Sequence, residues 1–173
     1  MALIKNRRIV PDTWQLLRPQ EDGTLPAVPP EGDVAVPLAF WLRQREALLA
    51  RAGRFGVWLD AADEPRAIAA DVGRLALIAV NFPKFGDGRG YSTARLLRER
   101  YGYRGELRAI GDVLRDQLQF MADCGFDSFL LRVDQRAEEA LKAFDEFSEH
   151  YQATVSEPLP LFRRRVSAVT RNE

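Results

Sequence analysis

The sequence predicts an α/β fold with a mainly parallel sheet, and its 173 residues suit a single domain. From residue 33 onward, short apolar segments alternate with stretches of helical character. Strands separated by helices of about 10–15 residues are typical of βαβ units. About five such units are visible, whereas a complete eight-unit barrel needs about 250 residues. The sequence therefore predicts an open sheet or an incomplete barrel, and it leaves the strand order open.

The first 32 residues are less regular than the rest. Residues 3–10 and 13–17 are expected to form short strands, separated by Pro11 and Asp12. The segment 19–32 contains four prolines and two glycines and is expected to be a loop or linker. The expected organisation is an N-terminal β segment with its Pro-rich linker, an α/β domain and an extended basic tail, at 1–32, 33–155 and 156–173.

The strands and helices of the α/β domain follow from apolar runs and helix signals. Strands are expected at 33–38, 54–60, 75–82, 105–111 and 126–132. The third of these, 75–82, carries no charge in any of its eight residues, as a strand buried on both faces requires. Helices are expected at 39–53, 63–73, 93–102, 113–125 and 135–150. Pro65 suits a first helical turn, and Ser92 and Asp112 are expected to cap the third and fourth helices.

Composition excludes several classes of function. The single Cys124 excludes an internal disulfide and a cysteine-based zinc or iron–sulfur site, and it is expected to be a buried, inert thiol. The single His150 excludes a histidine metal triad, so no metal site is expected. The balance of 25 Lys and Arg against 25 Asp and Glu argues against nucleic-acid binding. No apolar run approaches the ~20 residues that span a bilayer, and no signal-peptide pattern is present. We therefore expect a cytoplasmic protein with no membrane partner.

The glycine-rich segment 82–92 is the candidate ligand site, because ligands of parallel α/β folds bind where strands end. It places Lys84, Asp87 and Arg89 among glycines, directly before an expected helix. Glycine-freed amides, the helix dipole and two cations favour an anion such as phosphate, sulfate or a carboxylate. The expected ligand-binding residues are Lys84, Asp87, Gly88, Arg89, Gly90, Ser92 and Arg108. The alternative is a tight turn with solvated charges. The segment matches neither a P-loop nor a dinucleotide fingerprint, so ATP and NAD are not supported.

Two further charged patterns have structural and functional interpretations. Glu106 and Arg108 share one face of their strand. In the structural interpretation they lie near a sheet edge or form an ion pair, and in the functional one Arg108 points toward the glycine-rich segment. Asp112 and Asp116 are expected to be a helix cap and a surface residue rather than a catalytic pair. The strand rule also selects Asp60, Asn81, Gly111, Asp112 and Arg132. The tail, with its arginines and its PLPLF run, is expected to bind a second subunit or a partner, to strap its own domain, or to be a disordered end.

The run FPKFGDGRGYSTARLLRERYGYRGELRAIGDVLRDQLQFMADCGFDSF (82–129) closely resembles the bacterial family called domain of unknown function 934. The segments DVAVPLAFWL, FGVWLD and FSEHYQ are also similar to that family, so the resemblance extends over about 33–152. The family motif maps onto Lys84, Asp87, Gly88, Arg89, Gly90, Ser92, Arg95, Arg98, Gly105, Glu106, Arg108, Gly111, Asp112, Asp116, Gln117, Gly125 and Phe126.

The resemblance implies a role in assimilatory sulfite reduction. Members carry the label of oxidoreductase because they are often encoded beside assimilatory sulfite reductase and phosphoadenylyl-sulfate reductase. A neighbourhood of genes gives an association and no chemistry. The chain lacks a CxxC pair, so no cofactor is evident, although flavin phosphate also suits a glycine-rich loop. Two hypotheses follow: an accessory or anion-binding protein that partners sulfite reductase or another sulfur-assimilation enzyme, and an oxidoreductase-type enzyme acting on a sulfur- or phosphate-bearing substrate.

Overall fold

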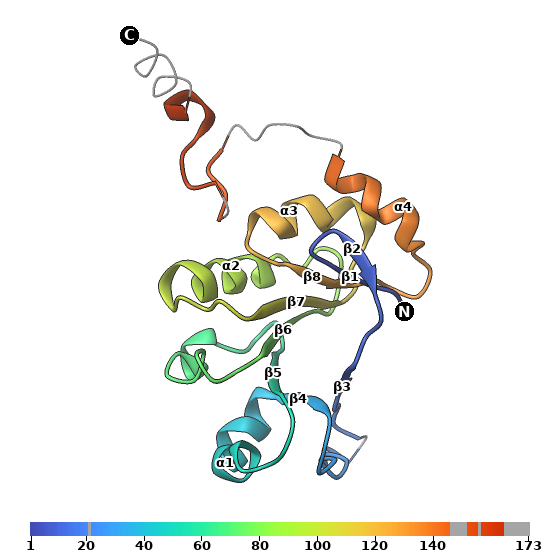
Figure 1. Cartoon of the computed structure of the whole chain (residues 1–173), viewed down its shortest axis with the longest axis vertical. Helices are drawn as coiled ribbons and strands as arrows, with labels where there is room; N and C mark the ends of the chain where they lie inside the picture. Colours follow the sequence, from blue (N-terminus) through green and yellow to red (C-terminus); the bar gives the residue numbers. More distant parts are fainter. Residues whose placement is uncertain (21, 146–151, 156, 165–173) are drawn as a thin grey trace.

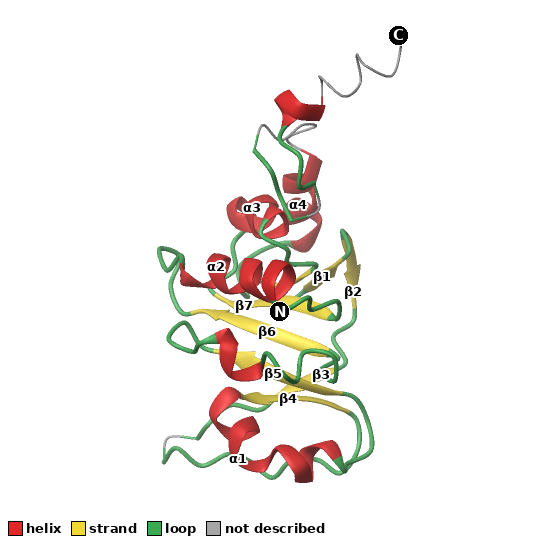
Figure 2. Cartoon of the chain, turned by 90° about the vertical axis from the view of Figure 1, so that its left-hand side faces the viewer, coloured by secondary structure: helices red, strands yellow, loops and turns green. Residues whose placement is uncertain are grey.

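The chain forms one eight-stranded, mainly parallel sheet that curls into a half-barrel with helices packed on it (Figures 1 and 2). The structure is a computed structural model and describes residues 1–20, 22–145, 152–155 and 157–164. The strand order is β2-β1-β8-β7-β6-β5-β4-β3. The predicted α/β class is confirmed, and of the two predicted sheet shapes the incomplete barrel is present.

Five parallel strands, neighbours in sheet order as in sequence, make up most of the sheet. They are β4 (Asp33–Pro37), β5 (Phe55–Leu59), β6 (Leu77–Phe82), β7 (Glu106–Gly111) and β8 (Ser128–Leu130). Strand β6 is central and pairs along its whole length with β7, from Leu77–Glu106 to Phe82–Gly111. This position explains why its sequence is apolar and uncharged.

The N-terminal segment belongs to the same sheet. Strands β1 (Leu3–Lys5) and β2 (Arg8–Val10) form a hairpin whose turn holds Asn6 and Arg7 at positive φ, and β1 pairs antiparallel with β8. Strand β3 (Trp14–Leu16) pairs in parallel with β4 at the opposite edge. The N-terminal residues therefore complete both edges of the sheet, and the segment between β2 and β3 passes over its inner face (Figure 1).

The helical segments differ from the predicted helices in their bounds. They are α1 (Leu38–Leu49), η1 (Pro65–Ile68), α2 (Arg89–Arg95), η2 (Leu96–Arg100), η3 (Arg115–Gln117), α3 (Leu118–Asp123), α4 (Ala137–Leu141) and η4 (Lys142–Asp145). Helix α2 begins at Arg89, so the predicted cap Ser92 lies inside the helix. The helix predicted after Pro65 shrinks to one 3-10 turn. His150 lies outside the described residues. No helix within the described part of the chain is long and apolar enough to cross a membrane.

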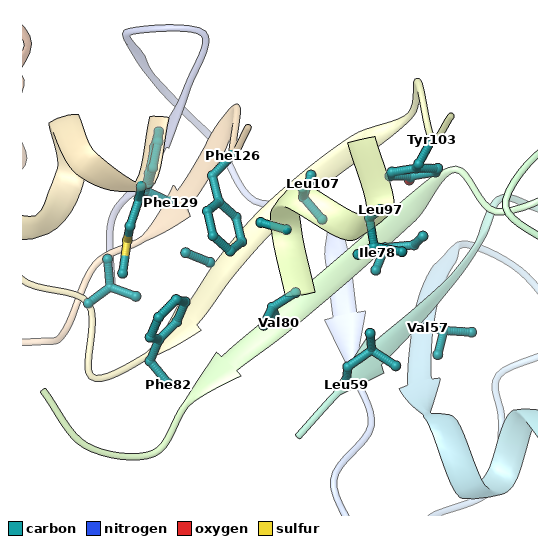
Figure 3. Packing of buried hydrophobic residues seen from close by; sticks show 14 of the residues in the cluster. Val57, Leu59, Ile78, Val80, Phe82, Leu97, Tyr103, Leu107, Phe126 and Phe129 are labelled. Carbon is teal, nitrogen blue, oxygen red and sulfur yellow. The ribbon is translucent and has the colours of Figure 1, made fainter. Parts of the chain in front are cut away.

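The main core lies between the sheet and the helices (Figure 3). Val57, Val80 and Leu107 point from the strands toward the helical layer and are at most 1% exposed. The ring of Phe82 packs against Phe126 at 5.8 Å between centroids. Each buried side chain of this size contributes roughly 1.5–3 kcal/mol. The core therefore fixes the strand ends from which the candidate site projects.

Candidate functional site at the carboxyl ends of the strands

Polar side chains gather where β5, β6, β7 and β8 end. Asp60 follows β5 and accepts a hydrogen bond from the amide of Asn81, near the end of β6, at 2.9 Å. The carboxylate of Asp63 in turn accepts the backbone N–H of Asp60 at 2.7 Å. The strand rule found Asp60 and Asn81, but Asp63 could not be singled out because its role depends on the turn after β5.

Asp112 links the ends of three strands. Its two carboxylate oxygens accept the backbone N–H of Phe85 at 2.8 Å and a guanidinium N–H of Arg132 at 2.6 Å. The prediction that Asp112 caps the following helix is wrong, because Gly111 at φ 93° turns the chain and η3 begins only at Arg115. Asp134 pairs with the same guanidinium at 2.6 Å. The two carboxylates raise the pKa of Arg132, and Arg132 holds the pKa of Asp134 at about 2.

The loop that follows β6 carries the cations of the predicted anion site. Arg89 forms a two-pronged ion pair with Asp87, at 2.9 and 2.6 Å, and Asp87 also accepts the backbone N–H of Arg89. The hydrogen bonds from Arg89 lower the pKa of Asp87 from 3.8 to about 2. The Lys84 side chain is exposed and forms no hydrogen bond or ion pair within residues 1–20, 22–145, 152–155 and 157–164. Arg89 is thus committed to Asp87, whereas Lys84 is available.

The remaining predicted residues of this loop shape the start of α2. Gly88 lies at the N-cap position, with φ −82° and no side-chain cap. Gly90 is buried, and a Cβ at this position would come within 2.6 Å of the Phe82 ring. Ser92 is exposed within α2. Gly90 therefore serves packing, and the loop presents Lys84 and Arg89 to solvent.

Arg108 lies on the inner face of the sheet and not beside this loop. It shares a row of register partners with Trp58, Ala79 and Ser128. Its guanidinium is 1% exposed and bonds Glu106 at 2.7 Å and Asp12 at 2.8 Å. The structural ion pair, one of the two interpretations of the sequence, is present. Its bond to Asp12 fastens the N-terminal segment across the half-barrel.

Sequence reasoning left Gln117 and Phe85 without a role, and Gln117 helps to hold Phe85 in place. Gln117 is 6% exposed and donates to the carbonyl oxygen of Phe85 at 3.3 Å and to the hydroxyl of Tyr91 at 3.2 Å. With the bond from its N–H to Asp112, Phe85 is fixed through both backbone groups. Its side chain is nevertheless 55% exposed. In the sequence, only its place in a glycine-rich loop indicated that Phe85 could belong to the site, because the direction of its side chain depends on long-range hydrogen bonds.

Arg98 is a motif residue with a structural role. Its guanidinium donates to the carbonyl oxygens of Tyr103, Gly105 and Gly125, each at 2.9 Å, and to Asp127 at 2.8 Å. It therefore ties together the loop before β7 and the loop before β8, at the opposite end of the sheet from Phe85. The motif thus combines residues that build the fold with residues that line the carboxyl edge.

Cys124 is buried, as predicted, and burial raises the pKa of its thiol. Across the described part of the chain, no group of three or more His, Cys, Asp and Glu side chains could hold a metal ion. For a cofactor phosphate, the described carboxyl edge offers Lys84 directly and Arg89 in competition with Asp87.

The fold and site define a half-barrel α/β protein with a charged edge and one fixed, exposed aromatic residue. A family profile described as "Bacterial protein of unknown function (DUF934)" matches residues 56–162. The chain therefore belongs to this family, as the resemblance of residues 82–129 predicted. No curated protein and no solved structure matches the chain.

Proposed function

We propose that this protein is a non-catalytic accessory protein of assimilatory sulfite reduction, which docks onto a sulfur-assimilation enzyme through the edge formed by Lys84, Phe85 and Arg89. Sulfite reductase is the first candidate partner. The pathway comes from the family resemblance, whereas the docking role comes from geometry. Each part can fail without the other.

The observation that carries the docking role is the fixed, exposed ring of Phe85. Exposed aromatic side chains surrounded by charged groups are typical centres of protein interfaces. The backbone of Phe85 is held by Asp112 and Gln117, while its side chain is 55% exposed. A side chain whose backbone is already ordered loses little further entropy on binding. The edge therefore suits a partner with an apolar pocket and an acidic group opposite Lys84.

A second candidate function is the binding of a small anion such as sulfite, sulfate or phosphate at Lys84 and Arg89. The two exposed cations of one loop favour it. The Asp87 carboxylate, however, already occupies the Arg89 guanidinium through two hydrogen bonds. A free anion would have to displace it, so docking is the better-supported function. Calorimetry with sulfite, sulfate and phosphate tests the alternative, and Arg89→Glu should abolish any binding that is observed.

An oxidoreductase-type enzyme remains the alternative class. Its support is the position of the edge, because parallel α/β enzymes hold their sites at the carboxyl ends of strands. The visible absorption spectrum of the purified protein tests the flavin version. A colourless protein with no bound flavin would count against it.

The docking proposal is tested by capture of purified sulfite reductase and of phosphoadenylyl-sulfate reductase on the immobilised protein. Phe85→Asp should lose the captured enzyme. The matched control is Leu42→Asp on α1, because Leu42 is similarly exposed at 52% and lies on a different element. Loss with Phe85→Asp and retention with Leu42→Asp would support the docking edge. Absence of any complex, with normal sulfite reductase activity in a deletion strain, would refute the accessory role.

A further inference from the structure

A hollow of about 330 Å³ lies between α2, α3 and the segment 152–154. This hollow, called here the helix hollow, is lined by Arg95 of α2, Phe120 and Asp123 of α3, and Cys124. Its volume falls in the range of pockets that accept a compact apolar group, about 300–1,000 Å³. Phe120 is 56% exposed, and its ring contacts that of Tyr91 in a tilted arrangement, with 4.8 Å between centroids. The helix hollow thus offers an aromatic wall that the described chain leaves open to solvent.

An apolar segment leaves the body directly beside this hollow. Residues 157–164, called here the C-terminal arm, extend away from the sheet and helices (Figures 1 and 2). Leu159 is 46% exposed and Phe162 is 55% exposed, so the arm carries two large apolar side chains in water. Exposed apolar side chains that lie on a protruding segment are typical of interaction sites. The arm therefore needs a surface that its own body does not provide in this conformation.

The base of the arm is anchored, which fixes where it starts. The N–H of Val155 donates to the carbonyl of Asp123 at 2.9 Å, and Thr154 and Glu157 exchange two hydrogen bonds of 2.9 Å. Thr154 is 6% exposed and also lines the helix hollow. The hollow and the base of the arm therefore meet at Thr154. An apolar arm next to an apolar hollow makes a self-complementary surface, which a two-fold axis can pair with itself.

We infer that a second copy of this chain occupies the helix hollow, with the C-terminal arm of each copy packing Phe162 and Leu159 against Phe120 of the other. Charge does not decide this pairing, because Arg95 lines the hollow beside Asp123, and Arg164 already pairs with Glu157 at 3.8 Å. The contact rests on the apolar side chains of the arm and on the exposed ring of Phe120. Reciprocal exchange gives two equivalent contacts per dimer and leaves the docking edge at Phe85 open. The inference does not depend on the proposed function.

Sedimentation velocity over a concentration series of the full-length protein tests the inference. The wild-type chain should be a dimer, and Phe162→Asp should raise its dissociation constant by at least ~10–100-fold, because each dimer loses two buried aromatic contacts. Phe120→Asp should do the same from the other side. The matched control Leu42→Asp, equally exposed on α1, should leave the dimer unchanged. A monomeric wild type, or an unchanged Phe162→Asp dimer, would overturn the inference.

A mixing experiment separates exchange between copies from a simple loss of folding. The Phe162→Asp chain keeps an intact helix hollow, and the Phe120→Asp chain keeps an intact arm. An equimolar mixture therefore contains one complete arm–hollow contact and should form heterodimers, although each variant alone is monomeric. The control is the circular dichroism spectrum of each variant, which should match that of the wild-type chain if the variant folds. A mixture that stays monomeric while both variants are folded would refute reciprocal exchange.

Discussion

Replacement of Arg98 by alanine should be the most damaging single change outside the apolar core. The Arg98 side chain is 9% exposed and holds three backbone carbonyls, from Tyr103, Gly105 and Gly125. Arg98→Ala leaves these carbonyls without their donor in a partly buried position. The change also removes the methylene groups that pack against Gly125, whose position would bring a Cβ to 2.6 Å from the Arg98 side chain.

The magnitude follows from these four bonds. A hydrogen bond to a charged group contributes about 1.5–3 kcal/mol, and removal of one partner of a buried network costs about 3–5 kcal/mol. Asp127 is 34% exposed, so water can replace part of its bond, and the backbone carbonyls account for most of the loss. We expect about 3–5 kcal/mol, which lowers Tm by roughly 6–20 °C for a domain of this size.

The assay is urea unfolding followed by the fluorescence of Trp14, Trp41 and Trp58, all of which are at most 8% exposed. Arg100→Ala is the matched control, because Arg100 is in the same helical segment but exposed. The control should change stability by less than ~0.5 kcal/mol. Equal unfolding midpoints for Arg98→Ala and Arg100→Ala would refute the structural role of Arg98.

Two further predictions concern the loop after β6. Gly90→Ala should destabilise the protein by about 1–3 kcal/mol in thermal unfolding, because the new Cβ meets the Phe82 ring at 2.6 Å. Gly88→Ala, with its nearest neighbour at 3.8 Å, should have little effect, and equal losses would contradict the packing argument. Asp87 should titrate near pH 2 by NMR, below its ordinary 3.8, and Arg89→Gln should return it toward 3.8. Because the folded pKa is the lower one, this pair stabilises the fold above about pH 4 and is lost as pH falls toward 2; an unshifted Asp87 would contradict the ion pair.

The central strands could be predicted from sequence because their signal is local. The uncharged run 75–82 becomes β6, and GELRAIG becomes β7 from Glu106. Predictions of helix starts failed where the conformation of the preceding loop decides. Ser92 was expected to begin a helix, but Asp87 accepts the N–H of Arg89 and starts α2 earlier. Helix-capping preferences are local, whereas the identity of the group that meets each N–H is set by the folded loop.

The second helix was overpredicted for a similar reason. After the 3-10 turn Pro65–Ile68, the N–H of Asp71 donates to the carbonyl oxygen of Ile68. The carboxylate of Asp71 accepts the indole N–H of Trp41 at 3.1 Å. This buried contact between segments thirty residues apart replaces a regular helix. In the candidate site, the strand rule found Asp60, Asp112 and Arg132, but Phe85 and Gln117 depend on bonds that sequence does not reveal.

The placement of the N-terminal strands has a consequence for biosynthesis. Strand β1 can form its hairpin with β2 early, but Leu3 pairs with Leu130, so β1 cannot join the sheet through β8 until almost the whole α/β region has left the ribosome. Strand β3 needs only β4 and can pair much earlier. Contacts between residues far apart in sequence form late and slowly. Residues 3–5 therefore reach β8 late, and until then the edge of the β1–β2 hairpin that will meet β8 stays exposed.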